Sequence, residues 1–128
     1  MKLLLDTCTF LWYVTASEKL SSAAKEAIEN PDNELFLSVA SAWEISVKYA
    51  KGRLALTESP GTFVPKYREL AHIATLELRE DAALLAAVLP HYHNDPFDRI
   101  LICQAVVHRL AIVSPDPLIA QYRATMLW

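Results

Sequence analysis

Two aspartates between His91 and Leu110 have a spacing that could serve chemistry. Asp95 and Asp98 bracket Pro96 and Phe97, directly before a long apolar stretch. Helix capping alone would explain them, because Asp95 suits the N-cap, Pro96 the first helical position, and Asp98 the positive end of the helix dipole. The other acids of the sequence are therefore needed to distinguish a helix cap from a functional site.

Three further acids follow short apolar runs that are typical of buried strands. The pairs are residues 2–5 with Asp6, residues 34–39 with Glu44 in the next helix, and residues 110–114 with Asp116. A helix from Pro96 to about Arg109 leads into the last of these runs and begins beside Asp98. Each acid thus stands close to the end of a predicted strand or to the start of a predicted helix.

The order of strands and helices predicts where these acids lie in the fold. Strands separated by helices favour a parallel sheet with right-handed crossovers, in which each helix runs antiparallel to its strands. Helix N-termini and strand C-termini then share one edge, which is the edge where open parallel sheets bind ligands. We therefore expect four acids to meet there: Asp6, Glu44, Asp98 and Asp116.

The rest of the chain predicts the elements that complete such a fold. Ser41 and Glu44 have the spacing of a capping box at the start of a helix that Gly52 ends. Pro60 and Pro65 are expected to interrupt the chain before a short helix at residues 66–70. The other predicted helices cover residues 10–14, 22–30, 79–89 and 118–123, and further short strands are expected within residues 72–78 and 126–128.

A cluster of carboxylates at one edge of a sheet indicates a cation site. Like charges repel, so several ionised acids at neutral pH require a cation, and Mg²⁺ or Mn²⁺ suits a site made of oxygen ligands. Such an ion can activate water and stabilise the charge that develops when a phosphodiester is cut. Neither a Ser/His/Asp relay nor a glycine-rich phosphate loop competes with this interpretation, and we expect His91 and His93 to serve surface or packing roles.

Composition limits the remaining possibilities. The 128 residues are 53% hydrophobic and contain no linker or repeat, so we expect one domain over residues 1–128. The net charge of −3 argues against a surface adapted throughout to nucleic acid, but allows a local basic strip. Cys8 and Cys103 suggest neither a disulfide framework nor a zinc site. The apolar start, KLLL, is too short for a signal peptide or a membrane span, which favours a cytoplasmic protein.

Four segments of the sequence resemble PIN domains of the VapC toxin type. They are LLLDTCTFLW, SVASAWEISVKYAKGRL, LPHYHNDPFDRILICQA and LAIVSPD, in this order, and they span nearly the whole chain. The DPFDR block together with residues 114–116 is the most specific part. The resemblance implies a three-layer α/β/α sandwich, a Mg²⁺- or Mn²⁺-dependent endoribonuclease of a toxin–antitoxin pair, and a VapB-like antitoxin partner.

The resemblance also implies roles for individual residues. The acidic catalytic site would comprise Asp6, Glu44, Asp98 and Asp116, with Asp6, Asp98 and Asp116 as the metal ligands, and Thr7, Ser114 and Asp95 in supporting roles. Asp116 has a proline on each side, which departs from the pattern of the family. Lys48, Lys51 and Arg99 are candidate contacts to RNA, although a solvated surface stripe is an equal alternative for the two lysines. A homodimer is also compatible with the sequence.

Other classes of protein fit less well. A receiver-type signalling domain needs an additional acid and a late lysine, and an aspartyl phosphatase needs a second Asp where Cys8 stands. The serious alternative is a catalytically inert PIN-like module that only holds a protein or RNA partner. Affinity for Mg²⁺ or Mn²⁺ that depends on Asp6 or Asp98 would distinguish an enzyme from such a module.

Overall fold

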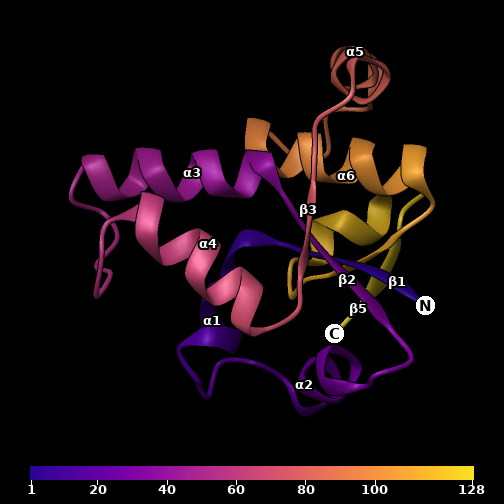
Figure 1. The fold of residues 1–128 in the computed structure, drawn as a ribbon. Helices are drawn as coiled ribbons and strands as arrows, with labels where there is room; N and C mark the ends of the chain where they lie inside the picture. The colour runs from indigo at the N-terminus through magenta and orange to yellow at the C-terminus, as the bar shows by residue number, and fades with distance from the viewer.

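The predicted strands pair into one five-stranded sheet in the computed structural model, which describes residues 1–128 (Figure 1). In spatial order the strands are β3 (Ala74–Leu76), β2 (Glu34–Ser38), β1 (Lys2–Leu5), β4 (Ala111–Val113) and β5 (Thr125–Leu127). Every neighbouring pair is parallel. Leu3, Leu4 and Leu5 of β1 are completely buried, because both faces of this central strand are covered.

Helices cover the two faces of the sheet and complete an α/β/α sandwich. They are α1 (Thr7–Val14), α2 (Ser22–Glu29), α3 (Val39–Ala50), α4 (Pro60–Leu70), α5 (Glu80–Val88), α6 (Pro96–His108) and the 3-10 helix η1 (Pro117–Gln121). Two hydrophobic cores follow from the alternation of side chains along β1. Leu3 and Leu5 pack in a core with Phe10 of α1, whereas Leu4 packs on the other face with Ile102 of α6. The three-layer architecture expected from the sequence is thus confirmed.

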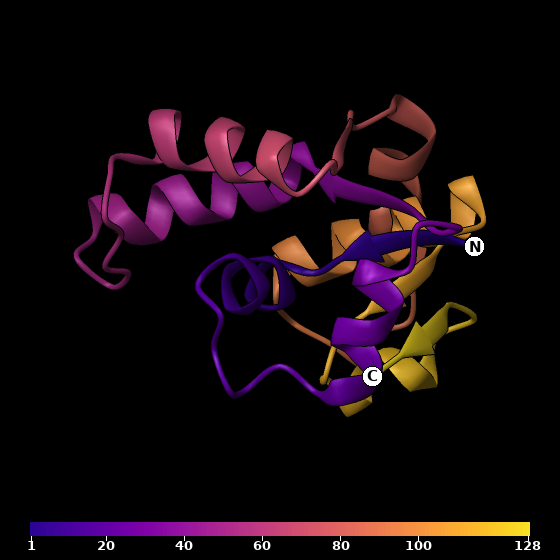
Figure 2. The same cartoon turned by 60° about the horizontal axis from the view of Figure 1, so that its bottom comes forward.

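Two helical pairs extend this framework. Figure 2 shows α3 and α4 lying side by side and projecting together beyond the sheet. Helix α5 packs mainly on α6 and forms an outer layer, which Figure 1 shows at the top. None of the helices is both long enough and apolar enough to span a bilayer.

The strand order creates a switch point beside β1. The chain moves from β1 to β2 and β3 on one side, and it adds β4 and β5 on the other. Helices that leave neighbouring strands in opposite directions open a crevice at the carboxyl ends of those strands. Asp6 directly follows β1 and Ser114 directly follows β4, so the two segments that border this crevice carry predicted site residues.

Three predicted helix starts were wrong. Helix α1 begins at Thr7 rather than at residue 10, with Asp6 as its N-cap. Helix α3 begins at Val39, and its N-cap is Ser38, whose hydroxyl accepts a hydrogen bond from the amide of Ala40. The capping box assigned to Ser41 and Glu44 therefore does not form, and both side chains are buried further along the helix. Helix α4 begins at Pro60, since proline suits the first position of a helix, and it continues through Pro65, so neither proline interrupts the chain here.

Candidate active site

The four predicted acids lie together at the carboxyl edge of the sheet. A cavity of about 260 Å³ there is lined by Asp6, Thr7, Cys8, Glu44, Lys48, Asp95, Asp98, Pro115 and Asp116. These residues come from segments that are far apart in the sequence, including the starts of α1 and α6, the second turn of α3 and the loop after β4. The structure thus brings together the acids that the topology placed at this edge.

Asp6 is fixed at the junction of β1 and α1. It is the N-cap of α1, and its Oδ1 accepts a 2.8 Å hydrogen bond from the amide of Thr9. The Thr9 hydroxyl in turn donates to the carbonyl of Val113 at the end of β4, with a distance of 2.9 Å. The cap uses Oδ1 and leaves Oδ2 for another ligand, so the capping role and a functional role are compatible in this residue.

Glu44 is buried and held by a hydroxyl and an amine. Its Oε1 accepts a 2.6 Å hydrogen bond from Thr7, whose hydroxyl also lies 3.0 Å from that of Ser41. Its Oε2 pairs with the ammonium group of Lys48, one turn further along α3. This hydrogen bond to Glu44 raises the pKa of Lys48, which therefore remains positively charged beside the cavity.

The two acids at the start of α6 have different roles. Asp95 is the N-cap, and its Oδ1 accepts a 2.9 Å hydrogen bond from the amide of Phe97. Asp98 makes no such cap, and its carboxylate lies 3.0 Å from His93 Nε2. Burial, followed by repulsion from Asp95, raises the pKa of Asp98 to about 7. Capping thus accounts for Asp95 but not for Asp98.

Asp116 is held in the loop after β4. Its Oδ1 accepts a 2.9 Å hydrogen bond from Leu118 at the start of η1, and its amide donates to the Ser114 hydroxyl at 3.1 Å. Its Oδ2 lies 2.7 Å from His93 Nε2. The flanking prolines therefore leave this carboxylate at the edge of the cavity.

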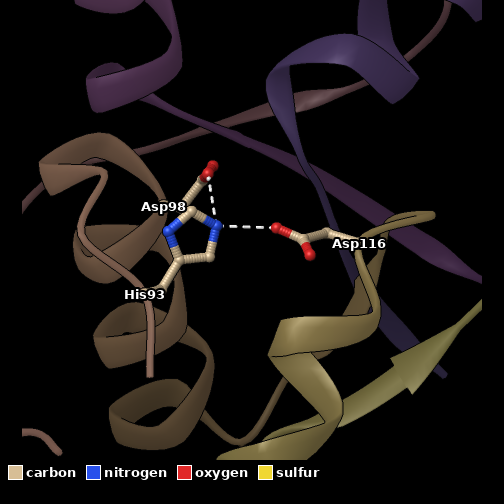
Figure 3. A group of neighbouring side chains, drawn as sticks. All are labelled: His93, Asp98 and Asp116. Carbon is tan, nitrogen blue, oxygen red and sulfur yellow. Dashed lines mark hydrogen bonds and ion pairs between the residues drawn. The ribbon is translucent and has the colours of Figure 1, made fainter. Parts of the chain in front are cut away.

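His93 belongs to the site, contrary to the surface or packing role expected from the sequence. Figure 3 shows its ring between Asp98 and Asp116, and its side chain is only 12% exposed. Single ligand atoms of these three residues lie within 4.8 Å of one another and could hold a metal ion. The signal in the sequence that could have indicated this place for His93 was its position in the loop before the DPFD block. His91 is exposed, as expected.

Arg99 does not occupy a position suited to nucleic acid, so this expectation was wrong. Its side chain is buried, and its guanidinium donates to four backbone carbonyls, those of Ala86, Leu89, Pro90 and His93. Carbonyls at the end of α5 lack partners within the helix, so a buried guanidinium can satisfy several at once. Arg99 therefore fixes the segment that carries His93.

The chemistry of the donor set favours a hard cation. The acids offer carboxylate oxygens, and the one sulfur that lines the cavity belongs to Cys8. In the metal-free chain, burial and the nearby Asp6 carboxylate raise the pKa of the Cys8 thiol, so the thiol is protonated there. Oxygen ligands of this kind are those that Mg²⁺ and Mn²⁺ prefer.

The family model for the PIN domain matches residues 3–124. The chain belongs to the PIN domain family. This PIN domain is 28% identical over 121 residues to "Ribonuclease VapC22" of Mycobacterium tuberculosis, an alignment that covers 94% of this chain and 91% of that protein.

Solved structures share the fold of this PIN domain at low sequence identity. A chain of VapBC2 from Rickettsia felis, bound to a DNA fragment from its promoter, superposes with a TM-score of 0.72 and 10% identity, covering 98% of this chain and 97% of that one. A chain of VapBC-1 from nontypeable Haemophilus influenzae gives a TM-score of 0.66 at 16% identity, with coverages of 98% and 96%. The PIN-type fold expected from the sequence is confirmed.

Proposed function

We propose that this PIN domain is a divalent-metal-dependent endoribonuclease and the toxin of a toxin–antitoxin pair. The observation that carries the proposal is the meeting of Asp6, Glu44, Asp98 and Asp116 in one cavity at the switch point of the sheet. The name of its relative, a ribonuclease, supports RNA as the substrate. Cleavage of RNA would take place in the cytoplasm.

The donor set fits Mg²⁺ or Mn²⁺. Asp6, Asp98 and Asp116 would hold the ion, since each directs a carboxylate toward the cavity. A bound ion would supply an activated water and neutralise charge on the leaving oxygen of the phosphodiester. Burial, followed by repulsion from Asp95, raises the pKa of Asp98, and a cation bound beside it would favour the ionised carboxylate.

The other residues of the cavity would position acids and substrate. Thr7 fixes one oxygen of Glu44 and Lys48 fixes the other, so the Glu44 carboxylate has a defined orientation. The Lys48 ammonium group is on a side chain that is 47% exposed, which allows contact with an RNA phosphate as well. Lys51 lines an adjoining hollow beside Asp95 and could contact the next phosphate.

An antitoxin partner follows from the same proposal. The solved structures of similar fold are named as VapBC complexes, which supports a VapB-like partner for this chain. An acidic pocket accommodates an inserted Arg or Lys, and Trp12 and Tyr13 line a separate hollow of about 270 Å³ that could take apolar side chains. Phe10, in contrast, lies fully inside the core. We also propose that the chain acts as one domain and can form a homodimer.

Cleavage of RNA by matched variants tests the proposed activity. Purified wild-type protein should cut RNA with Mg²⁺ or Mn²⁺ and not with EDTA, whereas Asp6→Asn and Asp98→Asn should not cut. Asp32→Asn is the control, because Asp32 is exposed and remote from the cavity. RNA that binds but stays intact with either ion would favour the inert module instead. If cells that express the wild-type chain without the partner encoded beside it are not harmed, this result would argue against the toxin role.

A further inference from the structure

His93 occupies a position that the proposed function does not use. Its Nε2 lies 2.7 Å from Oδ2 of Asp116 and 3.0 Å from Oδ2 of Asp98 (Figure 3). Two roles are compatible with these distances. The N–H group at Nε2 can donate a hydrogen bond to the two carboxylates, or Nε2 can be a ligand of a cation that they share.

The second ring nitrogen distinguishes the two roles. The backbone amide of Asp95 donates a hydrogen bond to Nδ1 of His93 at 3.2 Å. An amide N–H can only donate, so Nδ1 must present its lone pair and carry no proton. In the neutral ring the proton is then on Nε2, where it points to the carboxylates. A histidine that binds metal through Nε2 has the reverse arrangement and donates its Nδ1 proton to an acceptor.

We propose that His93 is a positioning residue whose Nε2–H bridges the Asp98 and Asp116 carboxylates, and that it is not a metal ligand. The bridge joins the start of α6 to the loop after β4, two segments whose negative charges would otherwise repel. Each carboxylate oxygen has a further lone pair, so the bridge leaves positions for a cation. The statement that His93 is not a metal ligand rests on the proposed function, whereas the assignment of the proton to Nε2 does not.

Hydrogen bonds to the backbone of His93 help to fix the position of its ring. The amide of His93 donates to the Tyr122 hydroxyl at 2.8 Å, and its carbonyl accepts from Arg99 at 3.3 Å. Tyr122 and Arg99 are both buried and come from different elements. With Asp95 at the ring, three residues fix the side chain and backbone of one loop residue, and this geometry places Nε2 between the two acids.

The bridge has a consequence for metal selectivity. If Nε2 keeps its proton, the ion has only oxygen ligands, and the site should favour Mg²⁺ or Mn²⁺ over Zn²⁺, which prefers nitrogen and sulfur ligands. A nitrogen ligand from His93 would shift this preference toward Zn²⁺. The two roles therefore predict different spectra and different effects of substitution.

Nuclear magnetic resonance of the metal-free protein tests the tautomer. Long-range ¹H–¹⁵N spectra, recorded at a pH well above the usual histidine pKa, should show the His93 proton on Nε2. A proton on Nδ1 would overturn the proposal. His91→Gln assists assignment, because His91 is exposed and lies outside the cavity.

Manganese binding tests the consequence for the metal site. Pulsed electron paramagnetic resonance of the Mn²⁺-loaded wild type should show no directly bound nitrogen, and a directly bound nitrogen would overturn the proposal. Gln at position 93 can place an N–H near the position of Nε2, whereas the shorter Asn cannot. We expect His93→Gln to keep Mn²⁺ affinity within a few-fold and His93→Asn to lose roughly 10- to 100-fold, the usual range for a residue that orients a ligand. Equal losses in both folded variants would count against the bridge.

Failure of the metal proposal would look different. If the wild type binds no Mn²⁺, or if Asp6→Asn binds Mn²⁺ as well as the wild type does, the proposed metal-dependent activity is wrong. The tautomer measured in the metal-free protein would still decide whether His93 bridges the two acids. Circular dichroism of each variant confirms that any lost affinity arises in a folded chain.

Discussion

Thr7 donates a 2.6 Å hydrogen bond to Glu44 and thereby connects the first turn of α1 to the second turn of α3. Both side chains are buried, so water cannot easily replace this bond if it is lost. The bond orients a carboxylate of the candidate site and also joins helices that follow two neighbouring strands. A single hydroxyl therefore contributes both to the packing of two helices and to the geometry of the candidate site.

Replacement of this hydroxyl should reduce stability. Thr7→Val keeps the shape of the side chain but leaves Glu44 Oε1 without its donor, which should lower the free energy of unfolding by about 1–3 kcal/mol. Thr7→Ser keeps the donor and should lose less. Urea unfolding measures the effect, with Thr62→Val on the exposed face of α4 as the control. Similar losses for Val and Ser at position 7 would show that packing of the methyl group matters as much as the hydrogen bond.

The pKa of Asp98 predicts how stability of the metal-free protein changes with pH. The pKa of about 7 in the folded chain exceeds the usual 3.8, so between these values the folded chain binds a proton that the unfolded chain has released. The contribution of Asp98 to the free energy of unfolding should therefore fall as pH rises from about 4 to 7. Asp98→Asn removes this contribution.

Urea unfolding in EDTA tests the role of this group. The stability of Asp98→Asn relative to the wild type should be higher at pH 8 than at pH 5. Asp98→Asn also loses a favourable charge at the start of α6, which costs up to about 1 kcal/mol. Comparing the relative stability of the variant at two pH values separates the effect of the titration from this cost. A relative stability that stays constant over this range would contradict the raised pKa.

Manganese should stabilise the wild type far more than a variant that lacks a ligand. Ion at 100 times its dissociation constant should add about 2.7 kcal/mol to the free energy of unfolding. Asp6→Asn should lose most of this gain, while Asp32→Asn should retain it. Thermal melts with and without Mn²⁺ measure the difference. An equal gain in the wild type and Asp6→Asn would show that Asp6 does not hold the ion.

Arg99 should matter for stability rather than for contact with RNA. Arg99→Ala removes a buried charged group that bonds four carbonyls, so we expect a loss of about 3 kcal/mol, the scale of broken hydrogen bonds to charged groups. Arg99→Lys should recover part of it. Arg53→Ala, on the exposed surface, should change stability by less than about 0.5 kcal/mol.

Hydrogen exchange locates the effect of Arg99. Loss of protection in Arg99→Ala should be greatest at the end of α5 and in the loop that follows, because their carbonyls receive the guanidinium. Unchanged protection there, with weakened RNA binding, would restore the contact role assigned from the sequence.

The convergence of the acids could be predicted because it depends on topology. Parallel strands with returning helices place Asp6, Asp98 and Asp116 at one edge whatever the details of the loops. The start of α3 could not be fixed in this way, since Ser38 and Ser41 are both plausible caps and only tertiary contacts show that Ser41 is buried against Thr7. Local spacing does not reveal which of two similar residues faces a neighbouring helix.

The positions of His93 and Arg99 were missed for a related reason. The loop from Leu89 to Asn94 has no periodic pattern, and its course is set by hydrogen bonds to Tyr122 and Arg99, residues from other elements. The charge of Arg99 predicts a surface residue, yet unpaired carbonyls at the end of α5 provide enough acceptors to bury it. Both cases depend on which backbone groups lack partners, and a sequence does not state this.

The contact between Thr9 and Val113 spans 104 positions of the chain. Strand β4 pairs with β1 and leads into the loop that carries Asp116, so the four acids come together only in a chain that extends beyond β4. A chain that stops before Asp98 would carry Asp6 and Glu44 without Asp98 and Asp116. Under the proposed function, we therefore expect such incomplete chains to be unable to cut RNA.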